Sequence, residues 1–291
     1  MGIVDTDQRP GGTEASFIIN RGEVYPIFIP SLEVFEDTTF LNITAADTIT
    51  SAITRNPQGS LLVPTGKTMV PIYEELRQLV LDYSNITLNN LDGYCGGNPF
   101  RKGMFTRYMT DNLIGYIDVP SGSWNIPDEA TRDPQREVER YQQIIDLHQP
   151  ADLAILGIGE NGHIAFNEPG TPVDSGVHVV DLTEETRLAN ADDFGDINLV
   201  PYQAITIGIG DILQAKRILL VAKGEGKREA IQKMIYGPIT TDVPASLLRF
   251  HPQVTIMMDI AAGRDIFDFA DVRHKYAFNP PVGINVDAKA A

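Results

Sequence analysis

The stretch ADLAILGIGENGHIAFNEPG, residues 151–170, decides the fold class of this chain. Its first half is an apolar run that ends in glycines, which is typical of a strand buried on both faces of a parallel sheet. Its second half places Glu160, Asn161, His163 and Glu168 within nine residues. A buried strand that leads at once into so many polar groups indicates that the following loop has a function.

Strand and helix patterns alternate on both sides of this stretch. This alternation predicts an α/β fold of three layers, with a mostly parallel central sheet covered by helices on both faces, as in Rossmann-like folds. Helices are expected at 44–57, 71–83, 133–148 and 227–237, and strands at 59–66, 85–96, 151–159, 202–213, 217–226 and 253–259.

The chain shows no linker, low-complexity tract or fixed-period repeat, so we expect one α/β domain over residues 41–291. Residues 1–40 have mixed polarity and several Pro and Gly, and we expect them to form an N-terminal extension. Its segment EVYPIFIPSLEVF is compatible with an edge strand or an arm. The sequence does not indicate a role for this extension.

Composition narrows the classes of partner. The formal net charge of −16 disfavours nucleic acid, because no basic stripe is available to neutralise phosphates. No apolar run approaches the roughly 18 residues of a membrane span, and the N-terminus lacks a secretory signal pattern. The single cysteine, Cys95, excludes an intrachain disulfide and a cysteine-cluster metal site. These features favour a cytoplasmic protein with a small-molecule partner.

Unusual residues follow four of the predicted strands. They are the turn at 65–68, Asp92, the segment 160–168 and the segment 223–227. Ligands of such sheets bind outside the carboxyl ends of the strands. If the strands are parallel, these four loops converge on one edge of the sheet.

Two of the loops have the features of an anion site. Thr65, Gly66, Lys67 and Thr68 lie between a strand and a helix, where backbone N–H groups can hold an anion. The spacing of a nucleotide P-loop is absent. Lys227 follows two glycines at the start of another helix, where a cation is unfavourable unless an anion lies beside it. An ordinary turn and a solvated lysine remain the alternatives.

The other two loops carry groups that can transfer protons. Asp92 ends a strand and can be a general base, although Asp before Gly is also a common turn residue. His163 has Glu168 five residues on, and a carboxylate can orient a histidine for proton transfer. A metal site would lack a third ligand here.

Several segments resemble, in the same order, the landmarks of the glucosamine-6-phosphate deaminase family, which shares its fold with the 6-phosphogluconolactonases. LGIGENGHIAFNEPG closely resembles the family's signature segment, and VPTGKTMVPIYEEL resembles its phosphate loop. NNLDGYCG resembles its Asn-x-Asp-Glu-Tyr-x-Gly segment. The resemblance runs from about residue 40 to about residue 260.

This resemblance implies conversion of glucosamine 6-phosphate to fructose 6-phosphate and ammonia, with no metal and no organic cofactor. It implies that His163, oriented by Glu168, opens the sugar ring, and that Asp92 carries a proton between C2 and C1 to give an enolamine. Hydrolysis of the resulting imine would release ammonia. The residues implied to hold the phosphate are Thr65, Gly66, Thr68 and Lys227.

The chain departs from the family pattern at several positions. Asn161 stands where the family often has an Asp that helps to position the catalytic histidine, and an amide can still accept from an imidazole N–H. Gly93 replaces the usual Glu after the catalytic Asp. Asp192 stands where a phosphate-contacting Arg is usual, so we hypothesise that Lys67 and Lys227 bind the anion instead.

The departures leave alternatives for the substrate and the activity. Galactosamine 6-phosphate or another anionic sugar fits the same family. A 6-phosphogluconolactonase-like hydrolase and a non-catalytic sugar-phosphate-binding protein are further alternatives. His178 and Val180 stand where some members bind an allosteric activator, so we do not expect that activation. A homo-oligomer is compatible with the sequence.

Overall fold

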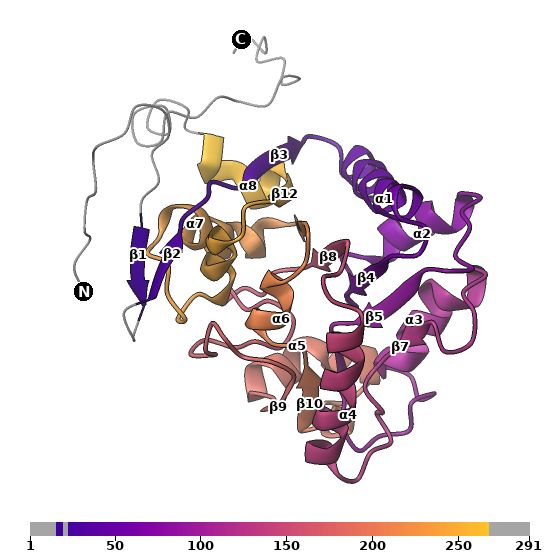
Figure 1. Ribbon diagram of the computed structural model, residues 1–291. Helices are drawn as coiled ribbons and strands as arrows, with labels where there is room; N and C mark the ends of the chain where they lie inside the picture. The colour runs from indigo at the N-terminus through magenta and orange to yellow at the C-terminus, as the bar shows by residue number, and fades with distance from the viewer. Residues whose placement is uncertain (1–15, 20–22, 268–291) are drawn as a thin grey trace.

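The computed structural model describes residues 16–19 and 23–267, drawn in colour in Figure 1. Its main feature is a seven-stranded sheet of order β3-β12-β11-β8-β4-β5-β7, in which every neighbouring pair is parallel. The predicted α/β fold with a parallel central sheet is therefore confirmed. Parts of the expected extension 1–40 and of the expected domain 41–291 lie outside the described residues.

The elements follow the predicted alternation. The strands are β1 (Ser16–Ile19), β2 (Glu23–Pro26), β3 (Ser31–Phe35), β4 (Ser60–Val63), β5 (Thr87–Asn90), β6 (Asp92–Tyr94), β7 (Trp124–Asn125), β8 (Leu153–Leu156), β9 (His178–Asp181), β10 (Gln203–Thr206), β11 (Ile218–Ala222) and β12 (Val254–Asp259). The α-helices are α1 (Thr38–Arg55), α2 (Val70–Gln78), α3 (Phe105–Asn112), α4 (Pro134–Leu147), α5 (Glu184–Phe194), α6 (Ile209–Leu213), α7 (Arg228–Tyr236) and α8 (Ile260–Gly263). The 3-10 helices are η1 (Ile114–Tyr116), η2 (Ile197–Leu199), η3 (Glu225–Lys227), η4 (Pro244–Phe250) and η5 (Arg264–Phe267).

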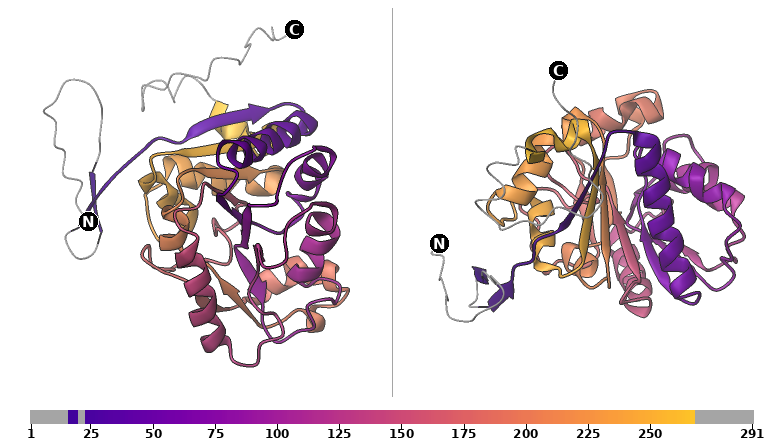
Figure 2. Two further views of the ribbon diagram at one scale, coloured as in Figure 1. Left: turned by 45° about the vertical axis from the view of Figure 1, so that its right-hand side comes forward. Right: turned by 90° about the horizontal axis from the view of Figure 1, so that it is seen from above.

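The parallel sheet is buried on both faces, as its apolar strands predict. Along β8, Leu153 and Ile155 pack into one cluster, with residues of α1 and α2. Ala154 and Leu156 pack into the opposite cluster, with residues of α4 and α7. Successive side chains of a strand point to opposite faces, so an uninterrupted apolar strand supplies both layers. The view from above in Figure 2 shows helices on both sides of the sheet.

The order of the strands creates a switch point between β4 and β8. From β4 the chain adds β5 and β7 toward one edge, and then returns to place β8, β11 and β12 on the other side. Ligands of open α/β sheets bind at such a point, beyond the carboxyl ends of the strands. The turn at 65–68 follows β4 and the segment 157–168 follows β8, so these two loops flank the switch point.

A second sheet differs from the expectation. The segment 202–213 is predicted as a strand of the mostly parallel sheet, but its strand β10 pairs antiparallel with both β6 and β9. Ala204 and Ile205 of β10 are buried in two different clusters. Apolar composition reports burial on two faces and carries no information on strand direction, which is why this assignment is wrong.

The N-terminal part of the described chain joins the main sheet. Strand β3 lies within the expected extension and pairs in parallel with β12, so residues 31–35 form an edge of that sheet. Strands β1 and β2 form an antiparallel pair. Among the described helices, none combines the length and apolar character needed to cross a membrane.

Candidate active site

A cavity of about 1070 Å³ lies at the carboxyl ends of the central strands. The four loops that follow β4, β5, β8 and β11 all line it, as the parallel arrangement predicts. Glu168 is not among the lining residues, but it contacts Asn161 and His163, which line the cavity. The cavity brings together the predicted residues Thr65, Gly66, Lys67, Thr68, Asp92, Asn161, His163 and Lys227.

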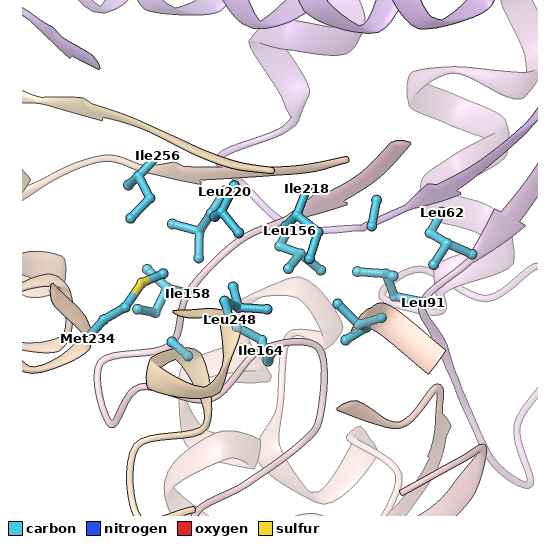
Figure 3. Packing of buried hydrophobic residues seen from close by; sticks show 14 of the residues in the cluster. Leu62, Leu91, Leu156, Ile158, Ile164, Ile218, Leu220, Met234, Leu248 and Ile256 are labelled. Atoms are coloured by element: carbon cyan, nitrogen blue, oxygen red, sulfur yellow. The ribbon is translucent and has the colours of Figure 1, made fainter. Parts of the chain in front are cut away.

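Asp92 is held at the base of this cavity by the hydrophobic core. Its neighbour Leu91 is buried in the core cluster under the parallel sheet (Figure 3). The side chain of Asp92 is only 6% exposed, and its buried Oδ1 has no hydrogen-bond partner among the described residues. Burial, with the nearby charge of Glu129, raises the pKa of Asp92 to about 7. A carboxyl group with this pKa can both take and return a proton near neutral pH.

His163 is held in the same way by its neighbour Ile164, which belongs to the same core cluster (Figure 3). Its imidazole packs against Gly159, where a Cβ would lie 2.4 Å from ring Cε1. Only glycine leaves room for the ring at this position. Its Nδ1 lies 3.4 Å from Oε1 of Glu168, close enough for charge attraction but without hydrogen-bond geometry.

Glu168 is the centre of a small polar network. Asn161 Nδ2 donates to Glu168 Oε2 at 2.7 Å, and Thr186 Oγ1 donates to Glu168 Oε1 at 3.0 Å. Burial alone would raise the pKa of Glu168, but the neighbouring His163, Asn161 and Thr186 outweigh it and lower this pKa. Glu168 is therefore ionised and can stabilise a protonated imidazole.

Asn161 acts differently from the expectation that its amide accepts from the imidazole. Its Oδ1 accepts from the backbone N–H of His163 at 3.1 Å, as in a turn closed by an Asn side chain. Through this bond and its contact with Glu168, Asn161 positions the pair without touching the ring nitrogens. Thr186, on α5, lies 18 residues from Glu168 in the sequence, and no local spacing signals this contact.

The turn at 65–68 lines the part of the cavity where we expect an anion to bind, here called the anion end. Gly66 has a φ of 109°, a left-handed conformation that favours glycine. Its carbonyl accepts from the hydroxyl of Tyr108 at 2.8 Å, and Tyr73 donates to the carbonyl of Pro64 at 2.6 Å. Two tyrosines from α3 and α2 thus fix the turn at the start of α2.

Lys227 enters the cavity from the loop after β11. The loop turns at Gly224, whose N–H donates to both carboxylate oxygens of Asp259, at 3.1 and 2.9 Å. Burial lowers the pKa of Lys227, and the charge of Glu160 opposes this shift. A half-buried ammonium group of this kind gains from a bound anion.

The helix α5 lines one side of the cavity. Its orientation bears on Asp192, which stands where the family usually has a phosphate-contacting Arg. Asp192 is exposed and lies outside the cavity lining, whereas its neighbour Asp193 lines the cavity. Lys67 Nζ lies 4.0 Å from Asp193 Oδ1, and both side chains are largely exposed. The acidic group that faces the anion end is therefore Asp193.

The lining of the cavity is balanced in formal charge, unlike this acidic chain as a whole. Five cationic and five acidic side chains line it, although the whole chain carries a formal charge of −16. Two of the cations, Lys102 and Arg107, come from positions outside any recognisable motif, and the sequence did not predict them. Lys223 belongs to the predicted strand-end segment 223–227, in which only Lys227 was expected to bind the anion. Within the described residues, no three His, Cys, Asp or Glu side chains are grouped so that they could hold a metal ion.

Comparison with known proteins agrees with this geometry. Residues 39–257 match the family of glucosamine-6-phosphate isomerases/6-phosphogluconolactonase. The chain belongs to this family.

Members of the family resemble this chain along most of their length. The glucosamine-6-phosphate deaminase of Lactobacillus delbrueckii subsp. bulgaricus is 45% identical over 229 residues, which cover 79% of this chain and 96% of the relative. That of Bacillus velezensis is 42% identical over 226 residues, which cover 76% and 94%.

Solved structures in the family show the same fold. A monomeric glucosamine-6-phosphate deaminase superimposes with a TM-score of 0.78 at 39% identity, covering 80% of this chain and 99% of that one. The 6-phosphogluconolactonase of Trypanosoma cruzi, at 17% identity, gives a TM-score of 0.69 and covers 84% and 99%. At that identity the second likeness concerns the fold alone.

The burial of Asp92 predicts a measurable dependence of stability on pH. Because its pKa is raised to about 7 in the folded protein, the folded state keeps a proton that the unfolded state loses. The contribution of Asp92 to the free energy of unfolding therefore falls as pH rises from about 4 to about 7. We expect Asp92→Asn to be more stable than the wild type at about pH 8, by on the order of 1–3 kcal/mol, and to lose this advantage toward about pH 4.

Urea unfolding of both proteins across this pH range measures the effect. A variant that is less stable than the wild type by the same amount at both ends of the range would contradict the burial of a charged Asp92.

Proposed function

We propose that this chain is an amino-sugar phosphate deaminase that converts glucosamine 6-phosphate to fructose 6-phosphate and ammonia. The observation that carries the proposal is a buried Asp92, with a pKa near 7, in one cavity with the His163–Glu168 pair and two anion-binding loops. The relatives named glucosamine-6-phosphate deaminase, at 42–45% identity and nearly full length, support it.

The phosphate group fixes the substrate at one end of the cavity. Backbone N–H groups of residues 65–68 at the start of α2, the Thr side chains and the ammonium group of Lys227 bind it. Anchoring the phosphate places the sugar ring across the cavity, toward the loop after β8. His163 then takes the proton of the C1 hydroxyl and gives it to the ring oxygen, so that the bond between C1 and the ring oxygen breaks and the aldehyde forms. Glu168 stabilises the imidazolium form of His163 during this transfer.

Asp92 performs the isomerisation in the open chain. Its carboxylate takes the proton from C2, so that the C2–H bond breaks, while a proton of the substrate's ammonium group moves to the aldehyde oxygen O1 and an enolamine forms. The carboxylic acid then gives the proton to C1, so that a C1–H bond forms and C2 becomes an imine. Addition of water at C2 releases ammonia and leaves the ketose. Each step is a proton transfer or a hydration, so the scheme needs no metal and no organic cofactor.

The same reasoning ranks the alternatives. A lactonase has no use for a base that moves a proton between two carbons, and the lactonase structures share only the fold with this chain. Retention of a raised pKa at Asp92 beside an oriented His163 is not needed for a protein that only binds. Galactosamine 6-phosphate remains the second candidate substrate, since the cavity holds the same anion site. We also propose that the protein is cytoplasmic and that its partner is a small molecule. Formation of a homo-oligomer stays a prediction.

The activity and its pH dependence test the proposal together. We expect the purified protein to release ammonia and fructose 6-phosphate in equal amounts from glucosamine 6-phosphate. The base must be ionised, so kcat/KM should fall as pH decreases below about 7, and Asp92→Asn should lose at least about 1,000-fold in kcat. Ammonia release without ketose, or no release from a panel of amino-sugar phosphates, would contradict the function.

The two lysines should differ in their share of anion binding. Lys227 is half-buried, whereas the side chain of Lys67 is 71% exposed and has Asp193 as a partner. We expect Lys227→Ala to raise KM by about 10- to 100-fold, the cost of a charge-assisted hydrogen bond, and Lys67→Ala to raise it only a few-fold. Equal activity of Lys67→Ala and the wild type at subsaturating substrate would remove Lys67 from the anion site.

Two adjacent aspartates provide a matched pair of variants on α5. Asp193 lines the cavity and Asp192 does not, so only Asp193→Asn should relieve repulsion of an anionic substrate. We expect Asp193→Asn to lower KM by about two- to five-fold at low ionic strength, with less effect at high salt. Steady-state kinetics of both variants measure this, and an equal effect of Asp192→Asn would contradict the orientation of α5.

A further inference from the structure

Glu129 is a buried acidic residue for which the proposed reaction gives no role. It lies between β7 and α4 and is 1% exposed. Its Oε1 accepts from the backbone N–H groups of Tyr94 at 3.1 Å and Phe105 at 2.9 Å, and its Oε2 accepts from that of Thr106 at 2.9 Å. Burial raises the pKa of Glu129, and the three N–H donors oppose this shift by stabilising the carboxylate form.

The three donors belong to two separate walls of the active site. Tyr94 ends β6, the short strand that begins with Asp92. Phe105 and Thr106 are the first residues of α3, and Phe105 lines the cavity. Helix α3 has no side-chain cap of its own, so Glu129 both satisfies its first N–H groups and interacts with the positive end of its dipole. One carboxylate therefore joins β6, which carries the base, to the start of α3, which lines the cavity.

The loop that carries Glu129 is itself fixed in place. The carbonyl of Glu129 accepts from the N–H of Gly97 at 2.8 Å, and Glu137 Oε1 accepts from the N–H of Asp128 at 2.7 Å. At Gly93 a Cβ would lie 3.1 Å from Pro127 of this loop. The loop thus packs closely against the position after Asp92, and this contact holds Glu129 near the strand that carries the base.

The charge of Glu129 also acts on Asp92. It adds to burial in raising the pKa of the Asp92 carboxyl group. Burial raises the pKa values of the tyrosines that face Asp92, so these tyrosines stay uncharged at neutral pH. Burial also raises the pKa of the Cys95 thiol near Glu129 to about 12, so this thiol stays uncharged as well. These tyrosines are Tyr73, Tyr94 and Tyr141. His163 lies in the same cavity as Asp92.

We propose that Glu129 is a positioning residue for the proton transfer by Asp92: its buried carboxylate holds β6 and the start of α3 in one fixed arrangement and sets the electrostatic environment of the base. The inference rests on the proposed role of Asp92 in deamination. It assigns to Glu129 two separable effects, one on geometry and one on charge.

Two substitutions separate these effects. Glu129→Gln keeps the shape but removes the charge and places an amide N–H₂ against a donor, so kcat should fall by about 10-fold or more. Removing the negative charge favours ionisation of Asp92, so the acidic midpoint of the kcat/KM profile should move to lower pH by roughly one unit. Glu129→Asp keeps the charge but cannot reach all three donors, so kcat should fall while the midpoint stays within about 0.3 units of the wild type. In both variants KM should change less than about two-fold, because Glu129 does not line the cavity.

Asp152→Asn is the matched control. Asp152 is also a buried carboxylate that accepts from a backbone N–H, that of Ser60 at 3.2 Å, and it pairs with Lys216 at 2.6 Å. It lies at the amino ends of the strands, away from the cavity. We expect Asp152→Asn to lower the thermal midpoint of unfolding with no change in kcat or in the pH profile.

The outcomes distinguish the inference from the function beneath it. Absence of deamination by the wild type overturns the proposed function. If the wild type is active and Glu129→Gln matches it in kcat and in acidic midpoint, the role of Glu129 is overturned. The same holds if the Glu129 variants only lose stability, as expected for Asp152→Asn. If Glu129→Gln does not fold, Glu129→Asp decides: unchanged kcat per folded molecule contradicts the inference, and a lower kcat at constant KM supports it.

Discussion

The burial of one carboxyl group, that of Asp92, is the constraint on which the rest of the site depends. A carboxylate taken out of water is costly unless it is paired, and Oδ1 of Asp92 has no partner among the described residues. The cost appears as a pKa near 7. The hydrophobic core keeps Asp92 buried, because Leu91, the residue before it, belongs to the core and β6 is paired with β10. Stability is thus reduced at the place where the proposed reaction moves a proton.

The remaining parts of the site are organised around this base by helix α5. Thr186, on the cavity side of α5, holds Glu168 and so orients the His163 pair. Two helical turns further along the same face, Asp193 forms an ion pair with Lys67 of the turn at 65–68. A single helix therefore contacts both the proton-transfer end and the anion end of the cavity.

Much of the fold and part of the site follow from local sequence patterns. Uninterrupted apolar strands alternating with helices predict the parallel sheet, and parallel strands bring their terminal loops, with Asp92, His163 and Lys227, to one edge. These inferences succeed because period and burial are local properties. The direction of β10 is not predictable in this way, because an apolar strand buried on both faces reads the same in either direction.

Other features depend on contacts between distant segments or on helical phase. Whether Asp192 or Asp193 faces the cavity is decided by a rotation of about 100° per residue along α5, which the motif alone does not fix. Glu129 reaches Tyr94 from 35 residues away, and Thr186 reaches Glu168 from 18 residues away. Such pairings are properties of tertiary packing, so no spacing rule contains them.

The titration of the Asp92 carboxyl group tests the account most directly. It can be followed by NMR through the signal of the carboxyl carbon in aspartate-labelled wild-type protein. Burial in a fixed, largely apolar setting predicts a midpoint near pH 7. A midpoint near the ordinary aspartate value of about 4 would show that Asp92 is solvated and ionised throughout, and would contradict the account.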